Sequence, residues 1–238
     1  RWLGLILMAP AFLFSPAKPT HGEFTYTLLD VGQGMASVIQ TAKHSLIYDT
    51  GTRVSDSFDI GELVVVPYLR AKGINTVDSM MISHEDNDHR GGAKYITQTL
   101  DVNEIISSDS SSLNNQTPKP CASGQRWQWD GVDFEILSPP TKHQLNDNNG
   151  SCVLRISNNN HSLLLTGDIQ KQTEGNLIKQ YNSTLASEVM TVPHHGSKTS
   201  SSTAFINAVS PEIGLITAGY RSRFGHPNQA IVKRYQSK

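Results

Sequence analysis

The chain has 238 residues, of which 17% are charged and 37% are hydrophobic, and its formal net charge is −1. These values are ordinary for folded globular proteins and exclude an intrinsically disordered chain. The length allows one substantial domain or two small ones. The balanced charge argues against a strongly basic nucleic-acid-binding protein, so a polyanion would have to be held by a local patch or by metal ions.

The chain opens with Arg1 and an uncharged apolar run at residues 2–14. This run is shorter than the roughly 20 residues that a membrane-spanning helix needs. We expect residues 1–21 to be the end of a transmembrane segment and its linker, with residues 22–238 as a soluble domain tethered to a membrane. The alternative is a signal peptide with Arg1 as its n-region, although no clear cleavage site follows.

The first half of the chain is predicted to consist mainly of strands and turns. Alternating or apolar segments separated by glycines predict a β-meander, with strands at residues 24–30, 36–40 and 44–49. A helix should begin near Pro67 and end at Gly73. An apolar strand at residues 77–83 should then deliver His84, and a second helix should run from Gly91 to about Leu100.

The second half repeats this mixture of strands and helices. The predicted strands are two hairpins and two single strands, at residues 127–137, 152–157 with 161–166, 186–192 and 213–217. The predicted helices are at residues 171–181 and 203–209. Two strand-rich halves with interspersed helices are compatible with an α/β fold, an αββα sandwich of two mixed β-sheets flanked by helices.

The segment His84-Glu-Asp-Asn-Asp-His89 is the strongest chemical signal in the chain. It follows an apolar strand, and its imidazole and carboxylate groups can converge from a tight loop on two metal ions. Such ligands suit Zn²⁺ or Mn²⁺. The alternative, a solvated acidic turn, accounts poorly for the residues that accompany this motif further along the chain.

Three later segments also place metal-binding side chains at the ends of strands or in turns. They are Asp168 after an apolar strand, His194 and His195 after another, and His226 in a Phe-Gly-His-Pro turn. A single Gly-Asp pair is usually only a turn. The four segments in this order form a specific pattern.

This order of motifs resembles the metallo-β-lactamase superfamily. More narrowly, several segments are similar to the C-terminal domain of ComEC proteins, the inner-membrane DNA channels of natural transformation. The similar segments are Leu29-Asp-Val-Gly-Gln-Gly34, Tyr48-Asp-Thr-Gly51, Ser83-His-Glu-Asp-Asn-Asp-His-Arg-Gly-Gly92, Leu164-Leu-Thr-Gly-Asp168 and Pro193-His-His-Gly-Ser-Lys-Thr-Ser200. The resemblance covers roughly residues 22–230.

The resemblance implies a role for each matching residue. His84 and Asp86 would hold one metal, Asp88 and His89 the other, and Asp168 would bridge them. His195, or else His194, would complete the second site. Asp88 and His226 are the expected catalytic residues, His226 by binding substrate or donating a proton. Asp49 would support a ligand histidine, and Asp30 and Gln33 would line the same end of the sandwich, with Gln33 contacting substrate.

Two departures from the superfamily pattern concern the first metal and the turn after Gln33. The usual histidine between the metal loop and the bridging aspartate has no convincing match, since His143 and His161 fit poorly. Polar residues could fill that corner instead: Asn146, Asp147, Asn149 and Ser151. Many relatives also have Asp where this chain has Met35.

An oxygen-rich site points to a phosphodiester substrate, attacked in line by a metal-bound hydroxide. Ser197, Lys198 and Ser200 could contact phosphate, although Lys198 could equally be a solvated loop residue. Residues 221–238 carry five Lys or Arg and no Asp or Glu, and form either a DNA-tracking segment or a soluble tail. The Trp127 and Trp129 side chains share one strand face, where packing is expected rather than base stacking.

The motifs and the resemblance favour a nuclease that degrades one strand of incoming DNA on the extracytoplasmic side of the inner membrane. Its partners would be DNA, the channel part of the same chain and other DNA-uptake proteins. Two alternatives stay open: a metallohydrolase of a small phosphodiester or ester, and a non-catalytic DNA-guiding module. Cys121 and Cys152 are either joined by one disulfide or are two buried thiols.

Overall fold

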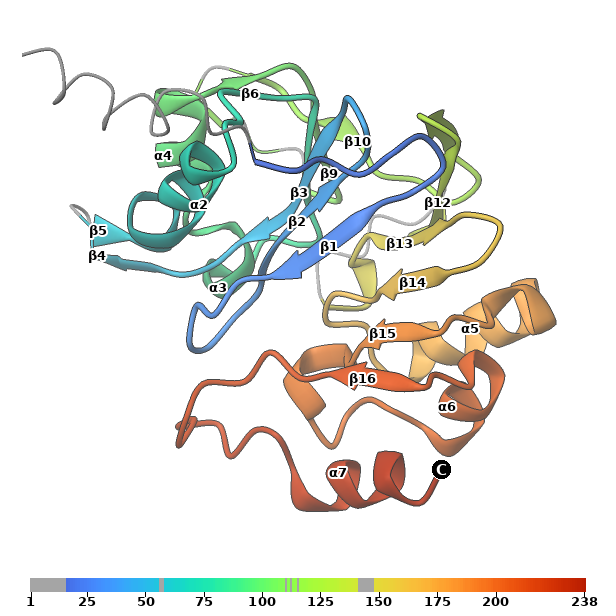
Figure 1. Ribbon diagram of the computed structural model, residues 1–238. Helices are drawn as coiled ribbons and strands as arrows, with labels where there is room; N and C mark the ends of the chain where they lie inside the picture. The colour runs from blue at the N-terminus through green and yellow to red at the C-terminus, as the bar shows by residue number, and fades with distance from the viewer. Residues whose placement is uncertain (1–15, 56–57, 110, 112, 115, 141–147) are drawn as a thin grey trace, which may run out of the picture.

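The computed structural model describes residues 16–55, 58–109, 111, 113–114, 116–140 and 148–238 (Figure 1). Within those ranges, no helix is both long and apolar enough to cross a membrane. The apolar run at residues 2–14 lies outside the described residues, as do His143, Asn146 and Asp147. The predictions that concern them therefore stay predictions.

The first sheet has six strands in the order β1-β2-β3-β7-β9-β10. Their bounds are β1 Thr25–Leu28, β2 Ala36–Gln40, β3 Ser45–Thr50, β7 Ser79–Ile82, β9 Ile105–Ser107 and β10 Lys119–Pro120. The first three strands are antiparallel neighbours, which confirms the predicted meander, and the strands from β3 to β10 run parallel. The sheet is therefore mixed.

The second sheet has six strands in the order β11-β12-β13-β14-β15-β16. Their bounds are β11 Arg126–Trp129, β12 Val132–Ser138, β13 Val153–Ser157, β14 Ser162–Leu165, β15 Val189–Thr191 and β16 Ile213–Leu215. The first four are antiparallel, whereas β14, β15 and β16 run parallel. Both expected hairpins are therefore present in this second mixed sheet.

Helices cover the outer face of each sheet, as Figure 1 shows. Those on the first sheet are the π-helix Gly61–Val65, α2 Val66–Ala71 and α4 Ala93–Thr99, and those on the second are α5 Lys171–Tyr181 and α6 Thr203–Val209. Short strands β4 Arg53–Ser55 and β5 Phe58–Asp59 pair with each other, as do β6 Thr76–Val77 and β8 Asp101–Val102. The remaining short elements are helix α3 Asn87–Arg90 and 3₁₀ turns at Asn148–Gly150, Asn182–Leu185 and Pro193–Gly196.

The layers follow from the alternation of side chains along the strands. In β14, Leu163 and Leu165 point into the space between the sheets, whereas Leu164 packs under α5 and α6. In β3, Leu46 points between the sheets and Ile47 packs under the first set of helices. Successive side chains of a strand lie on opposite faces, so continuous apolar strands bury both faces of each sheet. The predicted αββα sandwich is confirmed.

A disulfide between Cys121 and Cys152 links the two sheets, with Cα atoms 6.0 Å apart. Cys121 follows β10 of the first sheet, and Cys152 precedes β13 of the second. Trp127 and Trp129 pack against Phe134 in the core between the sheets, in agreement with the packing role expected for them.

Within the segment expected to be either a DNA-tracking segment or a soluble tail, residues Gln229–Gln236 form helix α7. Asn228 accepts a hydrogen bond from the backbone N–H of Ala230 and so caps the helix start. Ile231 is buried and Tyr235 packs against the core beneath α5 and α6. Two anchoring side chains on one face are enough to hold a short helix whose other residues are mostly polar.

Candidate metal centre

The predicted site residues meet at one end of the sandwich, beyond the carboxyl ends of the parallel strands. His84 follows β7, and Asp88 and His89 lie in the short helix α3 behind it. Asp168 follows β14, and His195 follows β15. Parallel strands in both sheets end at this edge, so segments far apart in the sequence supply side chains to one small volume.

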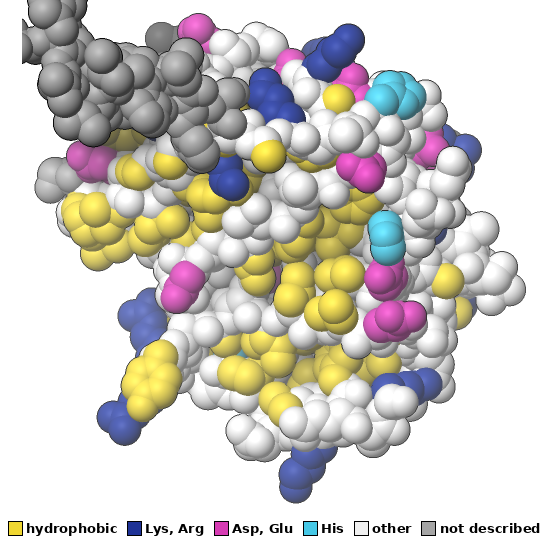
Figure 2. Space-filling view, in the orientation of Figure 1, with side chains coloured by type: hydrophobic (Ala, Val, Ile, Leu, Met, Phe, Trp, Pro, Cys, Tyr) yellow, Lys and Arg dark blue, Asp and Glu magenta, His cyan; other side chains and the backbone are white. Residues whose placement is uncertain are grey.

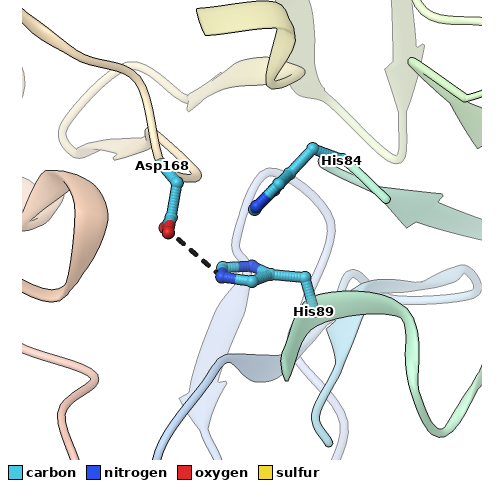
Figure 3. A group of neighbouring side chains, drawn as sticks. All are labelled: His84, His89 and Asp168. Atoms are coloured by element: carbon cyan, nitrogen blue, oxygen red, sulfur yellow. Dashed lines mark ion pairs between the residues drawn. The ribbon is translucent and has the colours of Figure 1, made fainter. Parts of the chain in front are cut away.

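One group comprises His84, His89 and Asp168, whose ligand atoms all lie within 4.8 Å of one another. Figure 3 shows the two imidazoles and the carboxylate turned toward a common centre. Asp168 Oδ1 is 3.3 Å from His89 Nε2. All three side chains are buried. These three residues could hold a divalent metal ion.

A second group overlaps the first and comprises Asp88, His89 and His195. His195 Nε2 lies 3.3 Å from Asp88 Oδ2 and 3.3 Å from Asp168 Oδ2. Asp168 therefore faces both groups, with Oδ1 toward His89, which the two groups share, and Oδ2 toward His195 of the second group. Of the two adjacent histidines left open by the sequence, His195 is the one that reaches this group.

Each of the three central imidazoles has a partner on Nδ1 and turns Nε2 inward. His89 Nδ1 lies 2.7 Å from Asp49 Oδ2, and His195 Nδ1 lies 2.8 Å from Thr217 Oγ1. His84 Nδ1 lies 2.9 Å from Ser83 Oγ. Such partners fix ring orientation and leave the other nitrogen free to bind a metal.

Asp49, predicted to support a ligand histidine, lies beside His89 and makes several further contacts. It is fully buried, and its carboxylate also accepts hydrogen bonds from Ser83 N at 2.7 Å and Ser83 Oγ at 2.8 Å. Ser83 and Thr217 were missed, because a hydroxyl residue next to a strand has no distinctive pattern. Only the fold shows that both face imidazoles.

Charge within the cluster shifts several pKa values strongly. Burial acts to raise the pKa of Asp168, but His89 and His195 outweigh it and hold that pKa well below its usual range. Burial acts to lower the pKa of His195, yet Asp168 and Asp88 raise it to about 9. Burial also acts to raise the pKa of Asp88, but the hydrogen bond with His195 is the main cause that lowers it to about 2. The cluster strongly attracts positive charge.

Two observations fit the cluster to bound cations. His84 Nε2 is buried and makes no hydrogen bond with any residue that the structure describes. His89 Nε2 and His195 Nε2 face each other at 3.2 Å, although neither imidazole has its other nitrogen free. A buried polar atom without a partner is costly, and a metal ion would satisfy all three nitrogens.

Asp86, His194 and His226 lie around the rim of this cluster. Asp86 Oδ2 is 3.3 Å from His84 Nε2, and its side chain is 54% exposed. His194 Nε2 lies 3.8 Å from Asp168 Oδ2 and 3.2 Å from Asn148 Nδ2. His226 stacks on His195 with ring centroids 6.2 Å apart, and its buried Nδ1 makes no hydrogen bond with the described residues.

The corner of the absent superfamily histidine holds other polar groups. Ser151 Oγ accepts a hydrogen bond from Asp168 N, so it supports the aspartate rather than the metal position. Asn149 accepts hydrogen bonds from Gln170 N and Thr173 Oγ1. His161 is exposed at the other end of the sandwich and pairs with Glu188.

The expected substrate contacts divide into exposed and buried groups. Lys198 is exposed. Ser200 is fully buried and donates to Ile169 O at 2.8 Å, so its hydroxyl holds the loop and does not face a substrate. Ser197 is also buried and is paired with Thr199 at 3.0 Å. Of the three predicted phosphate contacts, Lys198 is therefore the one whose side chain is exposed.

The turn after β1 contributes Asp30 and Gln33 at the same end, as expected. Asp30 is exposed and accepts a hydrogen bond from Gly32 N. Gln33 Oε1 accepts from Ser222 Oγ at 2.8 Å and from Gly219 N at 3.3 Å. The side chain of Gln33 thus joins the β1–β2 turn to the loop between β16 and α7.

The sequence profile of the metallo-beta-lactamase superfamily matches residues 29–219, which include the whole cluster except His226. The chain belongs to this superfamily. Solved structures agree on the fold. YhfI from Bacillus subtilis aligns with a TM-score of 0.55 over 90% of this chain and 93% of its own, at 11% identity. The metallo hydrolase Igni18 from Ignicoccus hospitalis aligns with a TM-score of 0.56 over 90% and 92%, at 13% identity.

Three curated relatives carry the words competence, recombination or ComE operon in their names. Competence protein ComA of Neisseria gonorrhoeae is 36% identical over all of this chain and 34% of its own length. Recombination protein 2 of Haemophilus influenzae is 34% identical over 97% and 29%. ComE operon protein 3 of Bacillus subtilis is 30% identical over 93% and 31%. The chain spans about a third of the length of these relatives.

Proposed function

We propose that this chain is a metal-dependent phosphodiesterase that cleaves DNA, acting as the nuclease domain of a natural-transformation channel. The observation that carries the proposal is the position of Asp168. Its two carboxylate oxygens face His89, which the two ligand groups share, and His195, which belongs to the second group. A carboxylate in that position suits a pair of cations, Mn²⁺ or Zn²⁺.

A pair of cations would supply the Lewis acidity that activates water and neutralises charge on an attacked phosphodiester. Asp88 lies at the open side of the cluster, with its side chain 27% exposed, where it would orient the attacking water. His226 lies beside His195, and burial together with the His195 charge lowers its pKa, so it is neutral near pH 7. From this position its imidazole would hydrogen-bond a substrate oxygen.

Support for DNA as substrate comes from the names of three relatives, which are Competence protein ComA, Recombination protein 2 and ComE operon protein 3. On that basis the domain would act on the extracytoplasmic side of the inner membrane and degrade one strand of the incoming duplex. Its partners would be the channel part of the same protein and other DNA-uptake proteins. The oxygen-rich ligand set, with Asp86, Asp88 and Asp168, favours a phosphodiester over a β-lactam.

The test uses the whole 238-residue chain, stripped of metal and reloaded with Mn²⁺ or Zn²⁺, with end-labelled DNA as substrate. Asp168→Asn and Asp88→Ala should each lower the cleavage rate at least 100-fold, because loss of even a supporting residue costs about 10- to 100-fold. Asp101→Asn is the matched control, since Asp101 is exposed in β8. It should cleave like the wild type.

Two other outcomes would replace the proposal. Cleavage of a small phosphodiester such as bis(p-nitrophenyl) phosphate without cleavage of DNA would assign the chain to small-substrate metallohydrolases. DNA binding without cleavage of either substrate, with any divalent metal, would make it a DNA-guiding module.

A further inference from the structure

The loop between β16 and α7 combines exposed aromatic and basic side chains in a way that the metal centre does not explain. Tyr220 is 90% exposed and Phe224 is 55% exposed. Arg221 and Arg223 lie between them in the segment 220–224. Figure 2 shows hydrophobic and basic side chains standing out together where this loop projects from the surface. We call residues 219–225 the aromatic–arginine loop.

The two arginines of this loop lie against its two aromatic rings. The Arg221 guanidinium carbon is 5.3 Å from the Tyr220 ring centroid, and that of Arg223 is 4.8 Å from the Phe224 centroid. None of the ion pairs found among the described residues includes either guanidinium. The positive charges are thus placed by cation–π contacts and left available to an anion.

The start of the loop is fixed near the metal centre by contacts with Gln33. Gln33 Oε1 accepts hydrogen bonds from Ser222 Oγ and Gly219 N. A Cβ on Gly219 would lie 2.9 Å from Gln33 N, so the two backbones touch at a point where only glycine fits. The loop therefore has a fixed start beside the site, although its side chains are exposed.

A row of rings leads from the loop to the metal ligands. Phe224 and His226 have centroids 6.0 Å apart, and His226 is 6.2 Å from His195. His195 in turn is 5.1 Å from His89. A chain whose phosphate lies at the cluster would therefore bring its neighbouring nucleotides directly over this loop.

We propose that the aromatic–arginine loop binds unpaired nucleotides of single-stranded DNA next to the phosphodiester that is cleaved. This inference rests on the proposed function for the position of the scissile bond. Arg221 and Arg223 would hold flanking phosphates through their planar forks. Tyr220 and Phe224 would stack on bases, which are open to them only in a single strand. The substrate class of the site is thereby narrowed to single strands.

The experiment measures the dissociation constant of the metal-loaded, 238-residue chain for a labelled ten-nucleotide oligodeoxynucleotide across a salt series. Arg221→Ala/Arg223→Ala should weaken binding at least 10-fold. The double change should also lower the slope of log affinity against log salt by about 1.4, since each phosphate contact to a single strand contributes about 0.7. Arg126→Ala, an exposed arginine on β11 paired with Glu135, is the charge control and should bind like the wild type.

Tyr220→Leu/Phe224→Leu keeps the apolar character and removes the π-faces. It should weaken single-strand binding about 5-fold or more and lower the salt slope by less than the arginine variant does, because both charges remain although their ring contacts are lost. Affinity for a blunt duplex should be lower than for the single strand and unaffected by this change. Metal content of every variant reports whether the site is intact.

Equal single-strand affinity in wild type and loop variants overturns the inference, even if DNA is cleaved. A loss confined to the arginine variants, with equal affinity for blunt duplex, overturns the base-stacking role and the single-strand assignment. Loop-dependent single-strand binding without any cleavage supports the inference and rejects the proposed nuclease function. The two proposals therefore fail separately.

Discussion

Each end of the sandwich contains a carboxylate with little exposed surface, but the groups that surround it differ between the two ends. At the far end, Asp130 accepts hydrogen bonds from Thr41 Oγ1 at 2.7 Å and Lys43 N at 2.7 Å, and pairs with His44 Nδ1 at 3.0 Å. At the site end, Asp168 faces His89 and His195, and His84 Nε2 has no hydrogen-bond partner in the described structure.

The contrast separates a structural charge from a functional one. Asp130 is surrounded by donors that satisfy it and tie the β2–β3 turn to the β11–β12 turn. At the site end, by contrast, imidazoles and carboxylates are crowded together, and their inward-facing nitrogen and oxygen atoms face one another. Such an arrangement destabilises the protein alone and is retained where a ligand completes it. The site end therefore requires support that the far end does not.

The largest expected effect concerns the disulfide, which lies on the site side of the sandwich. Cys152 N donates to Ser83 O, so the cross-link abuts the residue that orients His84. Cys121→Ser/Cys152→Ser should lower the free energy of unfolding by about 3–4 kcal/mol, the chain-entropy value for a closed loop of this length. Urea unfolding of the wild type with and without reductant, and of the double variant, measures it. Identical midpoints would show that the site end needs no covalent support.

The next effect is the pH dependence of metal affinity. A metal binds neutral imidazole, whereas the pKa of His195 is raised to about 9 by Asp168 and Asp88. The metal must therefore displace a proton below pH 9, and affinity should rise about 10-fold per pH unit for each proton displaced. Zn²⁺ titration calorimetry from pH 6 to 8, in two buffers of different ionisation enthalpy, counts those protons. A metal affinity that does not change with pH would contradict the explanation that Asp168 and Asp88 hold a proton on His195 for the metal to displace.

A third prediction tests the support that Asp49 gives to His89. Asp49→Asn preserves size but presents an amide where His89 Nδ1 and Ser83 need a carboxylate. Metal affinity should fall about 10- to 100-fold. Asp78→Asn is a useful control, because Asp78 accepts one backbone hydrogen bond from Ser45 at the far end. Unchanged metal affinity in Asp49→Asn would mean that His89 needs no orienting partner.

The smallest effect is at Asp130. Burial acts to raise its pKa, but Thr41, His44 and Lys43 N outweigh it and hold the pKa well below its usual range. A carboxyl with a depressed pKa stabilises the fold above its unfolded pKa, about 3.9, and that stability is lost as pH falls through the folded pKa. Asp130→Asn should cost about 1–2 kcal/mol at pH 7. The deficit, measured by urea unfolding, should shrink as the pH falls below 4. A deficit as large at pH 2 as at pH 7 would assign it to packing.

Much of the site could be predicted because its residues are adjacent or sit at recognisable strand ends. His84 to His89 are contiguous, and Asp168 and His195 each follow an apolar strand. The layers could also be predicted, since apolar strands flanked by helices leave few other arrangements. The choice between His194 and His195 could not, because both have φ above +50°, an uncommon conformation that turns the two rings in different directions.

The missed features are those that depend on the tertiary fold. Ser83 and Thr217 matter only because the fold sets their hydroxyls against imidazoles. Gln33 was expected to touch substrate, yet it holds the aromatic–arginine loop. Helix α7 has a weak apolar stripe, and its anchoring by Ile231 becomes visible only when the surface beneath it is known.

The central claim is that the cluster around Asp168 holds two divalent ions, and metal counting tests it most directly. Elemental analysis of the whole chain, after dialysis against Mn²⁺ or Zn²⁺ and removal of free metal, should give about two ions per chain. Asp168→Asn should hold at most one, while Asp101→Asn should hold two. Two ions retained in Asp168→Asn, or none in the wild type with either metal, would contradict the claim.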